Sequence, residues 1–180
     1  MLLDYDAALM RFGSSYQLKK ALAAKAIFKV EEGVYSNVEN PPLSAVICFA
    51  YPQVVLTMLS AFYHHGLTDT IPDHLDIAIP SSSRAPIHDG VMVHYSPKGF
   101  HEPGIVVDEK KGFPIRVYSK ERMLIELLRN KDRLPYDLYK EVLANYRRII
   151  HSLDLRFIDD ILEEFPKRAL IQRRLDEEVL

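Results

Sequence analysis

The sequence predicts an α+β protein with a short N-terminal region, residues 1–40, joined to a larger domain, residues 43–180. Three observations support this division. The first 36 residues pass from helical spacing to strand-like alternation. Asn40-Pro41-Pro42 then interrupts regular structure, and the remaining chain places alternating segments before a run of amphipathic helices. We therefore expect a small mixed or antiparallel sheet followed by C-terminal helices.

Composition is that of a soluble globular protein. Apolar residues make up 48% of the 180 residues and charged residues 27%, which is enough for a packed core and a solvated surface. The formal net charge is −2, so a nucleic-acid-binding surface would need a local basic patch. The single cysteine, Cys48, excludes an intrachain disulfide and a thiolate zinc cluster.

Neither end of the chain nor its apolar stretches indicate export or a membrane. The first residues carry acids and no basic segment before an apolar run, unlike a secretion signal. The apolar stretches at residues 43–51 and 54–63 are well short of the roughly 20 residues that a span needs. The sequence therefore predicts a cytoplasmic protein with no membrane contact.

Two short helices and a hairpin are predicted before residue 37. Residues 4–12 have the spacing of one helical face, and Gly13 can end that helix. A serine can cap the next helix, which carries a basic face. Residues 27–30 and 34–36 alternate around a Glu-Glu-Gly turn and predict a hairpin. Helix, turn, helix and hairpin form the plan of a winged helix-turn-helix, in which the second helix enters the major groove.

Lysines concentrate on the second helix and the hairpin, so we place the DNA-binding residues there. These residues are Ser14, Ser15, Tyr16, Gln17, Lys19, Lys20, Lys25 and Lys29. A charge cluster of this kind is also typical of a solvated helix face. There is no room before Asp4 for the leading helix of a full winged helix, so a homodimer would be needed for useful affinity.

Residues 59–80 contain the densest group of potential ligands and acid/base groups. They hold His64, His65, Asp69, Asp73, His74 and Asp76. One hypothesis for this cluster is a metal-dependent phosphoryl-transfer or hydrolytic enzyme. Against it, adjacent histidines on a helix point about 100° apart, and metal-binding helices prefer i, i+4 pairs. Turn chemistry explains the aspartates near Pro72, and Asp76 is expected to face away from the core. We predict no catalytic residue, no metal and no cofactor.

The larger domain is expected to contain one buried helix, four strands and three further helices. Residues 43–51 form a helix or a buried strand, and residues 53–65 a buried helix that ends at Gly66. The strands are expected within 75–79, 91–95, 104–107 and 113–118. The helices are expected after Ser119, from Pro135 and after Asp154, and the tail from Pro166 is expected to be partly frayed.

Three stretches in this order resemble the AbiEi-like antitoxins of the AbiE type IV toxin–antitoxin systems. They are residues 16–22 (YQLKKAL) with 27–35 (IFKVEEGVY), residues 60–69 (SAFYHHGLTD) with Ile71-Pro72, and residues 117–127 (VYSKERMLIEL). The resemblance covers residues 4–165. It implies a winged-helix region that represses the chain's own operon by binding promoter DNA, and a larger domain that counters a nucleotidyltransferase-like toxin without a stable complex. A third hypothesis is a protein-interaction module whose wing does not bind DNA.

Overall fold

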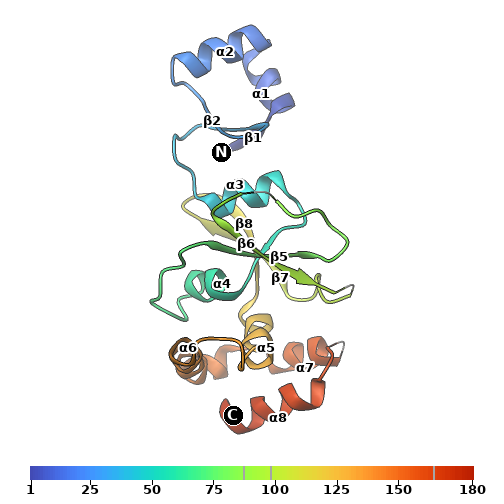
Figure 1. The fold of residues 1–180 in the computed structure, drawn as a ribbon. Helices are drawn as coiled ribbons and strands as arrows, with labels where there is room; N and C mark the ends of the chain where they lie inside the picture. The colour runs from blue at the N-terminus through green and yellow to red at the C-terminus, as the bar shows by residue number, and fades with distance from the viewer. Residues whose placement is uncertain (87, 98, 164) are drawn as a thin grey trace. The chain divides into compact units, whose positions relative to one another are not determined.

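A computed structural model describes residues 1–86, 88–97, 99–163 and 165–180. The chain forms two compact units, residues 1–54 with 107–115 and residues 55–106 with 116–180. Within the described ranges there are eight α-helices and two small sheets, so the predicted mixture of helices and strands is confirmed (Figure 1). The domain boundary expected near residues 41 and 42 stays a prediction.

The first unit begins with a three-stranded antiparallel sheet and two helices. Its elements are β1 (Leu2–Asp4), α1 (Tyr5–Phe12), α2 (Ser15–Ala23), β2 (Phe28–Glu31) and β3 (Val34–Ser36), with the sheet order β1-β3-β2. The Asp4 carboxylate caps α1 by accepting the Ala7 N–H at 2.7 Å. Gly13, at φ 84°, ends α1 and leaves room for the turn into α2. The strand β1 was missed, because its three residues gain their conformation from pairing with β3.

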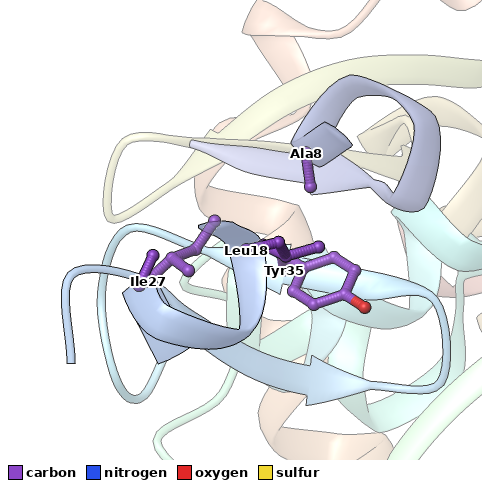
Figure 2. Close-up of a cluster of buried hydrophobic side chains, with 5 residues drawn as sticks. Ala8, Leu18, Ile27 and Tyr35 are labelled. Atoms are coloured by element: carbon purple, nitrogen blue, oxygen red, sulfur yellow. The ribbon is translucent and has the colours of Figure 1, made fainter. Parts of the chain in front are cut away.

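A small hydrophobic core holds these elements together. The buried residues are Ala8 of α1, Leu18 and Ala21 of α2, Ile27 just before β2, and Tyr35 of β3. Figure 2 shows the side chains of both helices and of the hairpin meeting at this cluster. The inward face of α2 is thus occupied by packing, and only its outer face is left for a ligand.

One helix expected from the sequence is replaced by a strand and a shorter helix. Helix α3 (Leu43–Ala50) belongs to the first unit, whereas β4 (Val55–Leu56) and α4 (Met58–His64) belong to the second. The predicted helix over residues 53–65 is therefore wrong in its first half. A continuous apolar run does not distinguish a buried strand from a buried helix, and the pairing of β4 with other strands decides the outcome. Gly66, at φ 67°, follows α4 as expected.

The larger sheet is mixed, and its five strands have the order β6-β5-β4-β8-β7. Its other members are β5 (Leu75–Pro80), β6 (Val91–Ser96), β7 (Ile105–Lys110) and β8 (Phe113–Tyr118). Strand β4 is antiparallel to β5 and parallel to β8, and β5 is parallel to β6. The expectation of a mixed or antiparallel sheet thus resolves to a mixed one.

Helices complete the second unit. They are α5 (Lys120–Arg129), α6 (Tyr136–Ile149), the 3-10 helix η1 (Ile150–Ser152), α7 (Leu155–Glu163) and α8 (Arg168–Glu178), and Figure 1 shows α5 to α8 gathered together. Ser119 caps α5 as predicted, since its hydroxyl accepts the Arg122 N–H at 3.2 Å. The tail is not frayed but forms α8, which buries Ile171 and Leu175. Within the described ranges, every helix is too short or too polar to cross a membrane.

Candidate functional site

The outer face of α2 presents the side chains that the sequence nominates for DNA binding. Leu18 points into the core, so Tyr16 and Lys20, four residues apart, share the opposite face. Tyr16 is 71% exposed, and Gln17 and Lys19 are exposed beside it. The alanine at position 23 is exposed on the same face and would let a ligand approach closely. This face is therefore accessible along its whole length.

Ser14 has a structural part at the start of α2. Its hydroxyl oxygen accepts the Gln17 N–H at 3.2 Å, which makes Ser14 the N-cap of the helix. Ser15 follows in the first turn and is exposed. The amides of this first turn lie at the positive end of the helix dipole, where a phosphate group is stabilised. The two serines are thus placed at the end of α2 that suits a phosphate.

The remaining two predicted residues lie beyond the helix. Lys25 adopts φ 55° directly after α2, where the Ala26 N–H closes the helix on the Ala21 carbonyl at 2.9 Å. Lys29 lies in β2 opposite Tyr35 of β3, and its side chain is exposed. The lysines therefore extend from the helix to the hairpin.

Charge on this region is uneven. Residues 14–30 contain four lysines and no acidic residue, although residues 1–40 as a whole carry five basic and five acidic side chains. Asp4 and Asp6 lie at the start of α1, and Glu31 and Glu32 lie at the hairpin turn. The basic surface is consequently small and limited to α2 and the strand that follows it.

The six histidines and aspartates of residues 64–76 are not gathered at one place. His64 ends α4, and the His65 Nε2 atom lies 2.7 Å from the Tyr118 carbonyl oxygen. The Asp69 amide donates to the Glu141 carboxylate at 2.9 Å, and Asp73 is exposed. Among the described residues there is no group of three or more His, Cys, Asp or Glu side chains that could hold a metal ion.

Asp76 differs from the expectation that it faces away from the core. It is only 4% exposed, and its carboxylate accepts a hydrogen bond from His94 Nε2 at 2.7 Å. His74 Nε2 lies 3.4 Å from the same oxygen. Residues on both faces of β5 are buried, Asp76 and Ala78 on one face and Ile77 and Ile79 on the other, so neither face of this strand is open to solvent.

This group lines a cavity of about 560 Å³ inside the second unit. One wall is the face of β5 and β6 that carries His74, Asp76 and His94. His74 and Asp76 are two residues apart, and this spacing predicts that both side chains lie on one face of the strand. His94 reaches them only because β5 pairs in parallel with β6. A single sequence does not reveal that pairing.

Another part of the cavity lining comes from the end of α5 and the loop after it. Glu126, Arg129, Asn130 and Arg133 line it. The Glu126 carboxylate accepts hydrogen bonds from Arg129 at 2.9 Å and from the Asn130 amide at 3.1 Å. These residues were not among those predicted from the sequence to form a site. Their spacing on α5 was the available signal for a side-chain network.

The structure is similar to the crystal structure of the RV2827C protein from Mycobacterium tuberculosis. The two share 14% sequence identity with a TM-score of 0.64, over 98% of this chain and 71% of that one. At this identity the likeness concerns the fold. No model of a protein family matches the chain, and no curated protein sequence matches it.

Proposed function

We propose that this protein is a non-enzymatic, cytoplasmic antitoxin of a type IV toxin–antitoxin system that also represses its own operon by binding promoter DNA. The observation that carries the DNA-binding part is the exposed outer face of α2, where Tyr16, Lys19 and Lys20 stand clear of the core. The antitoxin part rests on the resemblance of residues 16–35, 60–72 and 117–127 to AbiEi-like antitoxins.

The arrangement of the first unit supports a shortened winged helix-turn-helix. Two helices joined by a tight turn precede the β2–β3 hairpin, and β1 adds a third strand beside β3. In such a module α2 would enter the major groove, and Lys29 on the hairpin would contact a phosphate. Exposed lysines supply the sequence-independent part of the affinity, and Gln17 and Tyr16 have side chains that can reach base edges.

A titration of promoter DNA with the full-length protein tests this role. Replacing Lys19 and Lys20 by alanine removes two positive charges from α2. The plot of the logarithm of the association constant against the logarithm of salt concentration should therefore become shallower, its negative slope decreasing in magnitude by about 2. The matched control replaces Lys140 and Arg173 by alanine, which removes two exposed charges from α6 and α8 of the second unit. The control should bind the promoter as the unchanged protein does.

Two outcomes would count against the proposal. One is that the unchanged protein fails to bind its promoter fragment at low salt. The other is that the α2 variant and the control lose affinity to the same extent, because binding would then follow total charge instead of the α2 surface. Circular dichroism of both variants establishes that they are folded.

The toxin-neutralising part has a separate test. A nucleotidyltransferase-like gene beside this one would be expressed alone and together with the protein, and cell growth measured. Co-expression should restore growth, although a pull-down of the two proteins should recover no stable complex. Growth arrest that persists at high levels of the protein would exclude the antitoxin role.

A further inference from the structure

We propose that the cavity of the second unit binds a small organic phosphate, with the phosphate held between Arg129 and Arg133. This inference goes beyond DNA binding and toxin neutralisation and does not depend on either. It starts from a cavity of about 560 Å³ whose lining includes charged side chains from β5 and from the end of α5 and the loop after it. That volume lies within the range of pockets that bind metabolites and is far larger than one phosphate ion needs.

Arg133 is the side chain most available to a ligand. It lines the cavity from the loop between α5 and α6 and is exposed. Arg129 lies four residues before it, at the end of α5, and its side chain is one-third exposed. One guanidinium nitrogen of Arg129 lies 2.9 Å from a carboxylate oxygen of Glu126. A guanidinium offers five N–H donors, so Arg129 keeps donors for a second acceptor. Two guanidinium groups in the lining of one cavity suit the charge and the three terminal oxygens of a phosphate monoester.

Asp76 and Glu126 balance the formal charges of Arg129 and Arg133 in the cavity lining, but both carboxylates are already bound to neighbouring side chains. Glu126 is shared by Arg122, Arg129 and Asn130, so this cluster on α5 retains a net positive charge. Asp76 is almost fully buried and accepts from His94 at 2.7 Å. Each imidazole beside Asp76 has a second ring nitrogen, and the His74 and His94 side chains, which also line the cavity, are more than one-third exposed. Arg133 adds a further positive charge.

The dipoles of the two helices that end or begin at the cavity do not favour a cation over an anion. The end of α5 brings partial negative charge to the cavity, whereas Pro135, the N-cap of α6, also lines it and brings partial positive charge. These contributions are each about half a charge at most and oppose each other. The preference for an anion therefore depends on Arg133, which is exposed, and on the N–H groups that Arg129 does not direct to Glu126.

Apolar side chains account for the rest of the volume. Met58, Leu59, Met92, Leu134 and Pro135 line the cavity beside the charged groups. They would contact an uncharged, partly apolar portion of the ligand, and methionine side chains adapt to varied shapes. A phosphate ester that carries an organic group fits this division of the lining better than inorganic phosphate does.

Phenyl phosphate is a suitable probe, because it joins a phosphate to a flat apolar ring. Its dissociation constant for the full-length protein would be measured by calorimetry at fixed ionic strength, beside inorganic phosphate and benzoate. We expect phenyl phosphate to bind at least about tenfold more tightly than either, because each comparison ligand lacks one of the two contacts.

Variants assign the binding to this cavity. Arg133→Ala should weaken phenyl phosphate at least about tenfold, which is the usual loss for one charged hydrogen-bonding group. Met92→Ala should weaken the binding of phenyl phosphate but leave the affinity for inorganic phosphate unchanged. The control is Arg156→Ala on α7, an exposed arginine that is not part of the cavity lining. Lys19→Ala with Lys20→Ala should bind phenyl phosphate normally, which separates this test from that of DNA binding.

Three results would overturn the proposal. The first is no detectable binding of phenyl phosphate at millimolar concentration by the unchanged, folded protein. The second is an equal loss with Arg133→Ala and Arg156→Ala, which would indicate non-specific attraction of anions. The third is benzoate binding as tightly as phenyl phosphate, which would make the cavity a carboxylate site.

Discussion

The buried guanidinium of Arg122 donates a hydrogen bond to the Glu126 carboxylate, one turn further along α5, at 3.0 Å. Two more of its N–H groups donate at 2.7 Å to the carbonyl oxygens of Pro103 and Phe100. Arg122 thus connects the chain before β7 to the helix after β8. Glu126 continues the network to the cavity through Arg129.

Loss of the Arg122 side chain should strongly destabilise the second unit. Arg122→Ala leaves part of the Glu126 carboxylate and two partly buried carbonyl oxygens without these donors. It also removes the packing of the guanidinium against Tyr118 and Phe165, whose ring centroids lie 4.3 and 4.6 Å from Arg122 Cζ. We expect a loss of about 3–5 kcal/mol, measured by urea unfolding. Arg156→Ala, at an exposed position of α7, should change stability by less than about 0.5 kcal/mol. A loss below about 1 kcal/mol for Arg122→Ala would contradict this role.

Any side chain introduced at Gly104 is predicted to overlap with the side chain of Arg122. A Cβ atom at Gly104 would lie 2.5 Å from the Arg122 Cβ atom, and the residue has φ +82°. Gly99 provides the matched control, since its φ is +87° but nothing lies within 4 Å of a Cβ placed there. Alanine at either position incurs the cost of the left-handed backbone, about 1 kcal/mol, and only at Gly104 is the overlap added. Equal melting temperatures of the two variants would be inconsistent with this packing.

The docking of α8 should depend on pH through Glu178. Its carboxylate accepts hydrogen bonds from Lys131 Nζ and the Tyr139 hydroxyl, both at 2.8 Å. Burial acts to raise the pKa of Glu178, but these partners outweigh it and hold the pKa below the ordinary value of 4.5. A carboxyl whose pKa is lowered by folding stabilises the protein above its unfolded pKa, and this contribution is lost as pH falls through the folded pKa.

Unfolding experiments from pH 6 down to pH 3 measure this contribution. The unchanged protein should lose stability over the acid range, beginning at about pH 5, because the unfolded Glu178 then binds a proton first. Glu178→Gln should be less stable near neutral pH and show a shallower dependence below it. Glu177→Gln, at an exposed neighbouring position, is the control and should follow the unchanged protein. If the free energy of unfolding depended on pH in the same way for Glu178→Gln and the unchanged protein, Glu178 would have no role in the acid sensitivity.

Local signals predicted the helix ends well. Gly13, Gly66 and Ser119 were expected to end or cap helices, and each does so. A serine was expected to cap α2, and the structure identifies it as Ser14. These assignments succeed because a cap depends on contacts within about four residues.

Long-range contacts account for what the sequence did not reveal. Strand β4 is extended because of its pairing with β5 and β8, and α8 is ordered because Glu178 meets Lys131 and Tyr139. The cavity was missed for the same reason, since Asp76, His94 and Arg133 belong to three separate elements of the fold. Closeness along the sequence instead suggested a site among the histidines and aspartates of residues 64–76, but most of these side chains do not contact one another in the structure.

Repression and toxin neutralisation should be separable by one substitution on α2. Ala23 is exposed on the same face as Tyr16 and Lys20, so Ala23→Glu would place a negative charge where DNA phosphates are expected to lie. Like charges at a binding surface cost several kcal/mol, whereas an exposed helix position tolerates glutamate with little loss of stability. Ala169→Glu, at an exposed position of α8, is the matched control. A promoter–reporter assay should show loss of repression for Ala23→Glu alone, and both variants should rescue growth from the toxin. If a folded Ala23→Glu protein also failed to rescue growth, the two activities would have to share the α2 surface.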